Sequence, residues 1–411
     1  MSAQDSTETA VPAGEARPAK GLALVYLAVF GGYTGQQLLS PVLPPLSREL
    51  SLTEFQLGLV MSASAAMVAL TSTFWGRRSD VWGRKPLFTG ALLGTAVGLF
   101  AFAVTANLGM LGVLSAPVVF VAFLLTRGVL FGGALAALPV AANSYVADVT
   151  HGTRDRVKGL SRVGASLGLG LVLGPAVGGL LGRFGLLTAL YVAPVVLALA
   201  ALVVLVRLPR ETRHVDRPKP PKVRALDSRM WPFLVLGLAI YLSISLLSLS
   251  VGFLLQDRLH LDGATTAEYT GLVLLAGGLP MLLVQGIVVP KLGWTPLTLL
   301  RVGLPVTGVA FVVMVFAPNL AAMITASVLS GIGHSLAVPG YNSAPSLLFG
   351  SDEQGGVAGL IGSTNAVTLV VGPMAATGLY ELSPSAPFAV GAVVLMAAFV
   401  FSLLHPGVRQ R

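Results

Sequence analysis

The chain has 411 residues, of which 55% are hydrophobic and only 10% are charged. A soluble domain carries about 25% charged residues, so this chain has too few charges to cover a water-facing surface, and most of its surface is expected to face lipid. Its net charge of +9 is dispersed over loops rather than gathered in one stripe, which disfavours nucleic-acid binding. The absence of cysteine excludes disulfides, thiolate metal sites and thiol nucleophiles.

Apolar segments long enough to cross a bilayer, which takes about 20 residues, dominate the chain. Twelve are predicted, at 22–45, 55–76, 86–106, 115–141, 159–182, 186–207, 231–254, 268–290, 297–317, 320–344, 356–379 and 387–405. The fold class is therefore an all-α membrane protein. No cleavable signal peptide is evident, because the first apolar run leads directly into further spans.

Polar stretches divide these spans into two groups of six. Residues 1–20 are expected to form a disordered cytoplasmic tail, and 406–411 a second, short cytoplasmic tail. The basic, proline-rich stretch 208–230 is expected to be a cytoplasmic linker. It separates an N-terminal bundle, 21–207, from a C-terminal bundle, 231–405.

The basic residues predict the orientation in the membrane. We assign 22 of the 26 Lys and Arg to the termini and to alternate loops at the span ends, Arg127 to the inside of a span, and three arginines, Arg48, Arg183 and Arg258, to the opposite loops. Basic residues concentrate on the cytoplasmic side of membrane proteins. We therefore expect a multi-pass protein with both termini in the cytoplasm, and the short loops and compact size favour a bacterial inner membrane.

The two halves repeat several residues in the same order. Three sets recur at shifts near 200 residues: Gly76, Gly83 and Pro86 as Gly286, Gly293 and Pro296, Gly174-Pro175 as Gly372-Pro373, and Pro139 as Pro339. The repeats predict two pseudo-symmetric six-helix units.

The charged stretch between the second and third spans is the most informative motif. It reads Gly76-x-x-x-Asp80-x-x-Gly83-Arg84-Lys85, with one acid among four bases. This pattern resembles the loop between the second and third helices of major facilitator superfamily transporters. The resemblance implies that Asp80 latches the cytoplasmic side shut by contacting the start of the eleventh helix, near residues 355–356. The alternative is a loop that only sets topology.

A glycine-rich motif lies in the fifth span, with Gly170, Gly174, Pro175 and Gly178. Small residues at four-residue spacing leave one helix face bare for close packing, and a proline permits a bend. The motif resembles the antiporter motif of drug-exporting branches of the superfamily, such as tetracycline-efflux proteins. The alternative is a generic packing face.

Two charged residues stand in or near the fourth span. A charge at mid-span costs at least about 2.5–3.5 kcal/mol, so we expect Arg127 to face the central cavity and to act in proton coupling or in anion contact. A purely structural role is the alternative. Asp148 resembles the cytoplasmic end of the fourth helix in tetracycline exporters, and we expect it to order that loop with Arg154 or Arg156.

The spans contain no acid at mid-depth. Gln36 and Gln37 stand where many exporters carry an acid, and glutamine can bind substrate but cannot titrate. His334 is therefore the candidate proton carrier, since histidine titrates near neutrality, with a purely hydrogen-bonded histidine as the alternative. The remaining candidates for the cavity wall are Tyr33, Asn143, Gln285, Asn342 and Asn365, and for each of them a polar contact between helices is the favoured alternative.

These features favour a secondary active transporter that exports a small organic molecule by alternating access. The proton gradient would drive it, and we expect no cofactor, no metal, no enzymatic activity and a monomer in the lipid bilayer. The chain has no phosphate loop or dinucleotide fingerprint, which disfavours an ATP-driven pump. The alternatives are a uniporter or importer of an anionic molecule on the same fold, and a receptor or scaffold without transport.

Overall fold

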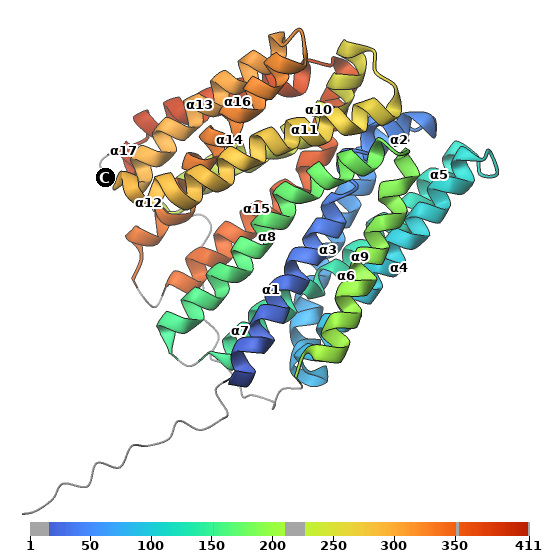
Figure 1. Ribbon diagram of the computed structural model, residues 1–411. Helices are drawn as coiled ribbons and strands as arrows, with labels where there is room; N and C mark the ends of the chain where they lie inside the picture. Colours follow the sequence, from blue (N-terminus) through green and yellow to red (C-terminus); the bar gives the residue numbers. More distant parts are fainter. Residues whose placement is uncertain (1–15, 151, 210–226, 351–352, 410–411) are drawn as a thin grey trace, which may run out of the picture.

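The computed structural model describes residues 16–150, 152–209, 227–350 and 353–409 (Figure 1), and these residues form helices, turns and loops without a strand. Eleven helical segments in the described chain are long and apolar enough to cross a membrane. An additional helix, α1 (Ala16–Gln37), occupies the place of the first predicted span. The prediction of an all-helical membrane protein is confirmed.

The N-terminal half contains α1 and nine further helical segments. They are α2 (Leu43–Glu49), α3 (Glu54–Trp82), α4 (Arg84–Met110), α5 (Ala116–Phe123), η1 (Leu124–Phe131), α6 (Gly132–Leu135), α7 (Ala137–Val149), α8 (Thr153–Gly182) and α9 (Leu186–Arg207). The segments α5, η1, α6 and α7 follow one another as a single membrane span, Ala116–Val149.

The C-terminal half repeats this plan. Its segments are α10 (Trp231–Leu259), α11 (Gly263–Leu283), η2 (Val284–Val288), α12 (Val289–Leu292), α13 (Pro296–Phe316), α14 (Leu320–Ser343), η3 (Pro345–Leu348), α15 (Gln354–Leu382), α16 (Ala386–Leu404) and α17 (Pro406–Arg409). The halves contact each other mainly through α8 against α11 and α3 against α15.

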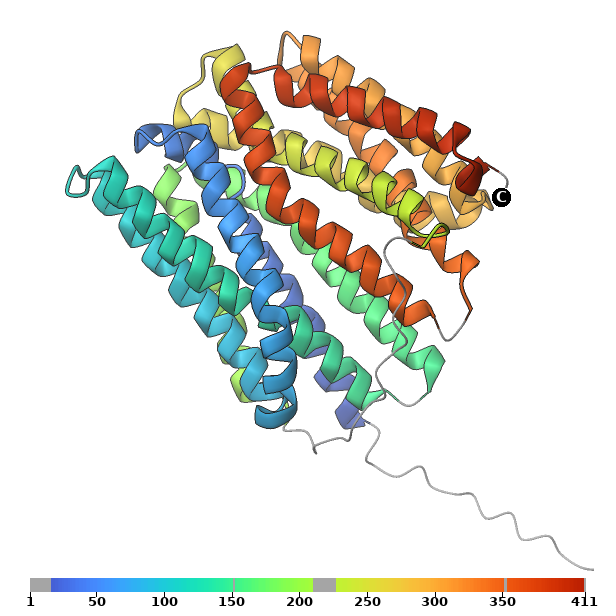
Figure 2. The same cartoon turned by 180° about the vertical axis from the view of Figure 1, so that it is seen from behind.

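The two halves meet at one end of the molecule and diverge toward the other. We call the end where α1 begins and α16 ends the terminal end, and the opposite end, which carries α2, the far end. Toward the terminal end, α8 and α11 draw apart in Figure 1, and α3 and α15 draw apart in Figure 2.

The space around the glycines on the facing helices shows the same divergence. At the far end, a Cβ atom on Gly58 of α3 would lie 2.8 Å from the Pro373 carbonyl of α15, and one on Gly179 of α8 would lie 2.7 Å from the Ala267 carbonyl of α11. Toward the terminal end, a Cβ atom would meet nothing within 4 Å on Gly76, Gly164, Gly286, Gly359 or Gly362. The halves are therefore joined at the far end and separate at the terminal end.

Helix α8 packs backbone to backbone against two neighbours. A Cβ atom on Gly170 would lie 3.0 Å from the Thr34 amide of α1, and one on Gly178 would lie 2.8 Å from the Leu38 Cα. Gly182, on the side that faces α11, would place a Cβ atom 2.6 Å from that of Ala267. The glycine face thus seats α8 between α1 and α11 and joins the two halves.

Several predicted boundaries differ from the structure. The first span ends at Gln37 rather than 45, because the proline-rich segment that follows turns and forms the separate helix α2. The predicted tails are partly helical, since α1 begins at Ala16 and α17 buries Val408. The charged stretch after the second span continues as helix to Trp82, and only Gly83, at φ 88°, interrupts it. Residues 1–15, 210–226 and 410–411 lie outside the described residues.

Replacing Gly178 by Val should lower the thermal unfolding temperature in detergent, because overpacking a close contact costs about 1–3 kcal/mol. The matched control is Gly164→Val, which adds the same side chain to the same helix where nothing lies within 4 Å. If both variants lose the same stability, the contact between α8 and α1 does not limit packing.

Candidate functional site

A cluster of polar side chains, which we call the Arg48 cluster, links the halves at the far end. Arg48 of α2 donates to Glu54 Oε1 from Nη2 at 2.8 Å, and across to Asp257 Oδ2 of α10 from the same nitrogen at 2.9 Å. Its Nη1 donates to Asp257 Oδ1 and reaches Gln256 Oε1 at 3.3 Å. Tyr380 of α15 donates to Asp257 Oδ2 at 2.6 Å and completes the cluster.

Two further polar links join the halves at the far end. The backbone amide of Phe55 donates to Glu381 Oε1 at 2.9 Å, and Arg183 lies 3.6 Å from Glu268. In each link the acid belongs to the C-terminal half and the donor to the N-terminal half. The far end is therefore held by complementary charges as well as by close packing.

The three arginines that depart from the basic-residue pattern have structural roles at this end. Arg48 and Arg183 contact acids of the opposite half. Arg258 binds the carbonyls at the end of α13, donating to Met314 at 3.0 Å, Ala317 at 2.8 Å and Val315 at 2.6 Å. Carbonyls at a helix end lack intrahelical partners, so the Arg258 guanidinium supplies donors that they would otherwise lack.

Two groups of α2 have shifted pKa values. Burial alone would lower the pKa of Arg48, but hydrogen bonds to Asp257 and Glu54 outweigh burial and hold it above the ordinary value. Burial raises the pKa of the Glu49 carboxyl, and the negative charge of Asp262 raises it further. Glu49 and Asp262 belong to opposite halves, so this pair opposes the attraction of the other far-end links.

At the terminal end, Arg84 organises the charged loop. It donates to Asp148 Oδ2 at 2.7 Å, to Asp80 Oδ1 at 2.9 Å and to the Ser79 carbonyl at 2.7 Å. The sequence predicted Arg154 or Arg156 as the partner of Asp148, whereas the structure pairs it with Arg84 of the preceding loop. Arg84 is the first residue of α4, which packs against α7, and sequence spacing did not reveal this neighbour.

Asp80 itself is 69% exposed, and its ion pair is with Arg84, one helical turn away. Its predicted contact with the start of α15 belongs to a state closed at the terminal end, and it stays a prediction. Gly76 faces open space in this structure. Gly83 has a positive φ of 88° at the break between α3 and α4. Lys85 is half-exposed beside this turn.

Arg127 lies in the π-helical segment η1 and is only 2% exposed. It donates to Ser64 Oγ of α3 at 3.1 Å, and its guanidinium carbon lies 3.9 Å from the centre of the Phe131 ring. Its Nε is buried without a hydrogen-bond partner in the described structure. The expected exposure to a central cavity is not found in this structure, because the Arg127 side chain is buried in contact with Ser64 of α3 and the Phe131 ring.

His334 is buried between α14 and α10, with both ring nitrogens in hydrogen-bonding contact. Nδ1 lies 2.9 Å from the Ser330 carbonyl, and Nε2 lies 2.9 Å from Ser243 Oγ. Ser243 in turn donates to the Ile240 carbonyl at 2.7 Å. The histidine therefore belongs to the C-terminal half, and Arg127 to the N-terminal half.

The polar candidates on α1 differ in their surroundings: two pack against α8, and one has a buried oxygen without a hydrogen-bond partner. Tyr33 and Gln37 pack their Cβ atoms against Gly170 and Gly174 of α8. The Oε1 atom of Gln36 is buried and has no hydrogen-bond partner in the described structure. In the C-terminal half, the Oδ1 atom of Asn365 is buried and has no hydrogen-bond partner among the described residues.

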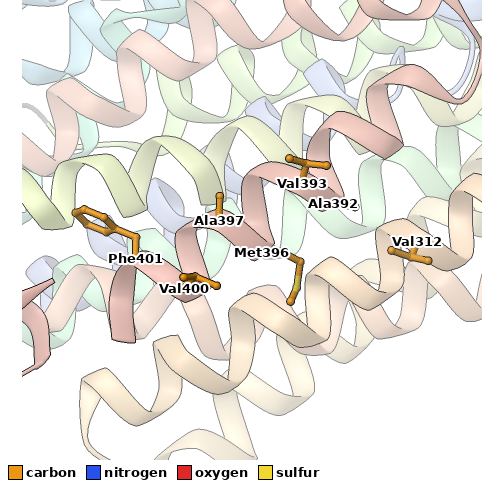
Figure 3. A pocket seen from close by; sticks show the side chains of 7 residues that line it. All are labelled: Val312, Ala392, Val393, Met396, Ala397, Val400 and Phe401. Carbon is orange, nitrogen blue, oxygen red and sulfur yellow. The ribbon is translucent and has the colours of Figure 1, made fainter. Parts of the chain in front are cut away.

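A groove on the C-terminal half lies away from these polar groups. Figure 3 shows its lining side chains, all apolar, on α13 and α16: Val312, Ala392, Val393, Met396, Ala397, Val400 and Phe401. Its volume is about 680 Å³. With no polar side chain, the groove suits an acyl chain rather than a polar ligand. The described residues contain no group of three His, Cys, Asp or Glu that could hold a metal.

Sequence comparison relates the chain to resistance proteins. The chain is 28% identical to the tetracycline resistance protein, class G, of Vibrio anguillarum over 94% of this chain and 97% of that protein. It is 23% identical to the quinolone resistance protein NorA of Staphylococcus aureus over 94% of this chain and 96% of that one.

Solved structures share the fold at low sequence identity. A peptide transporter POT in complex with sulfate matches at 16% identity with a TM-score of 0.73, over 96% of this chain and 97% of that one. A bacterial homolog of the human lysosomal transporter Spinster, in an inward-facing and occupied conformation, matches at 15% identity with a TM-score of 0.69, over 94% of this chain and 95% of that one. The family model of the Major Facilitator Superfamily matches residues 25–313 and 297–410, and the chain belongs to that superfamily.

Proposed function

We propose that this protein is a proton-coupled exporter of a small organic molecule that works by alternating access. The observation that carries this proposal is the asymmetry between the ends: the halves are joined at the far end and separate at the terminal end. Such an arrangement is one of the two states that rocking halves alternate between. The resistance proteins among its relatives support efflux as the direction.

The terminal end is proposed to face the cytoplasm of a bacterial inner membrane. Basic residues gather at this end, as expected for the cytoplasmic side, and both described termini lie there. The structural likeness to an inward-facing transporter agrees with this orientation. A substrate would enter from the cytoplasm between the separated halves, and closure there would be favoured by the contact of Asp80 with α15.

His334 is the proposed proton carrier, because its surroundings satisfy both protonation states. When protonated, Nδ1–H donates to the Ser330 carbonyl and Nε2–H donates to Ser243, whose hydroxyl donates to Ile240. When neutral, Nε2 accepts from the Ser243 hydroxyl after that hydroxyl rotates. A proton can therefore be added or removed without leaving a buried donor unpaired, which would cost about 1–3 kcal/mol.

The second candidate function, transport of an anionic molecule without protons, is favoured by one observation. Arg127 is buried in the membrane region with a single hydroxyl partner and a free Nε. A guanidinium has five N–H donors, so an anion that reached Arg127 would find donors that have no partner in this structure. Proton dependence of flux separates this candidate from the first.

His334→Gln should abolish coupling. With tetracycline as the probe in proteoliposomes, uptake driven by an imposed pH gradient should fall at least about tenfold, while downhill tetracycline exchange remains. The matched control is His405→Gln, which changes a histidine outside the spans. If wild-type tetracycline flux does not depend on the pH gradient, the proposal of proton coupling is wrong. If the His334→Gln variant keeps normal coupling, His334 is not the proton carrier.

Asp80→Asn should slow turnover, because it weakens closure of the terminal end. A carboxylate at a helix start contributes about 0.3–1 kcal/mol, or up to about 2 kcal/mol when partly buried, so tetracycline flux should fall roughly twofold to thirtyfold. Affinity for tetracycline should be unchanged. The control is Asp155→Asn, an exposed acid at the same end. Equal flux in both variants would mean that Asp80 has no gating role.

A further inference from the structure

We propose that Arg48 is a partner-exchanging latch of the far end: it is shared between Asp257 of the opposite half and Glu54 of its own half in this state, and it pairs with Glu54 alone when that end opens. The inference rests on the proposed alternating access, but it concerns a site that the charged-loop and glycine motifs do not contain. It explains how charges can hold the far end closed without preventing it from opening.

The two acids around Arg48 differ in where they stand. Glu54 is the first residue of α3, only six positions from Arg48, and both belong to the N-terminal half. Asp257 belongs to α10 of the C-terminal half, 209 positions away. Rocking of the halves therefore separates Arg48 from Asp257 but carries Glu54 along with Arg48.

Asp257 also keeps a partner of its own. The Tyr380 hydroxyl donates to Asp257 Oδ2 at 2.6 Å, and both residues lie in the C-terminal half. Each ion of the broken pair thus retains one hydrogen-bonded neighbour after separation. Because an unpaired and partly buried charge is costly, these two retained contacts lower the free energy of the far-open state.

Apolar contacts place Arg48 so that it can make this exchange. Pro44 of α2 packs against α10, where a Cβ atom on Gly252 would lie 2.7 Å from Pro44 Cγ. The Arg48 guanidinium lies 5.1 Å from the centre of the Phe253 ring. The side chains of Arg48, Glu54 and Asp257 are 25%, 22% and 35% exposed, so water can enter as the pair separates.

The latch makes two predictions of opposite sign. Removing the charge of Asp257 weakens only the far-closed state and should favour opening. Removing the charge of Glu54 leaves Arg48 dependent on Asp257, so it destabilises the far-open state more and should favour closure. A simple electrostatic clamp, in which both acids hold Arg48 in the closed state alone, predicts opening in both variants.

The absence of cysteine in the chain permits a direct test. Thr377 is fully buried where α15 meets Gly58 of α3 in this state, so a Thr377→Cys thiol can react with a maleimide only when the far end opens. The labelling rate in lipid nanodiscs then measures the far-open population even when that population is small.

We expect Asp257→Asn to raise the labelling rate roughly tenfold and Glu54→Gln to lower it roughly fivefold, the changes typical of one charge-assisted hydrogen bond. Tyr380→Phe, a milder change, should lower the rate like Glu54→Gln. Arg183→Gln removes a more exposed far-end charge and should change the rate less than about twofold.

A thiol at Thr307, buried within the C-terminal half between α13 and α14, reports unfolding and should stay unlabelled in every variant. Rates that rise for both Asp257→Asn and Glu54→Gln, or that change no more than in Arg183→Gln, would overturn the exchange. Because labelling requires neither substrate nor protons, loss of tetracycline flux or of coupling leaves this result unaffected. A Thr377→Cys thiol that never reacts would instead contradict alternating access itself.

Discussion

The close contact of α8 with α1 and α11 is the constraint on which the rest of the structure depends. Lipid offers little hydrophobic driving force between helices, so association depends on packing of small residues. Gly170 and Gly178 bring the α1 backbone to the α8 backbone, and Gly179 does the same for α11. Because this seam joins helices of both halves, it fixes where they touch and leaves the terminal end free to separate.

The placement of charges differs between the two ends of the molecule. At the far end, bases of the N-terminal half face acids of the C-terminal half, while Glu49 and Asp262 oppose each other across the same boundary. At the terminal end, Arg84 holds Asp80 and Asp148 within the N-terminal half. The far-end charges thus act between the halves, and the Arg84 contacts act within one, which is the distribution needed to stabilise a state open at the terminal end.

The membrane interior isolates two ionisable groups. Arg127 has one hydroxyl and one aromatic ring as neighbours, whereas His334 is fully supplied with hydrogen-bond partners. The neighbours of His334 could therefore pair its ring nitrogens in either protonation state once the Ser243 hydroxyl rotates, whereas the Arg127 guanidinium keeps donors without partners. The two lie in opposite halves, so any coupling between them passes through the contact between the bundles.

The sequence alone determined the number of spans, the two repeated halves and the family resemblance, because apolar length, composition and glycine spacing are local properties. It did not reveal the Arg48 cluster, since Arg48 and Asp257 are 209 positions apart and carry no motif. It also gave Asp148 the wrong partner and Arg127 the wrong surroundings. Only the tertiary structure decided these points, because the direction of a side chain around a membrane helix depends on which neighbouring helix packs against it.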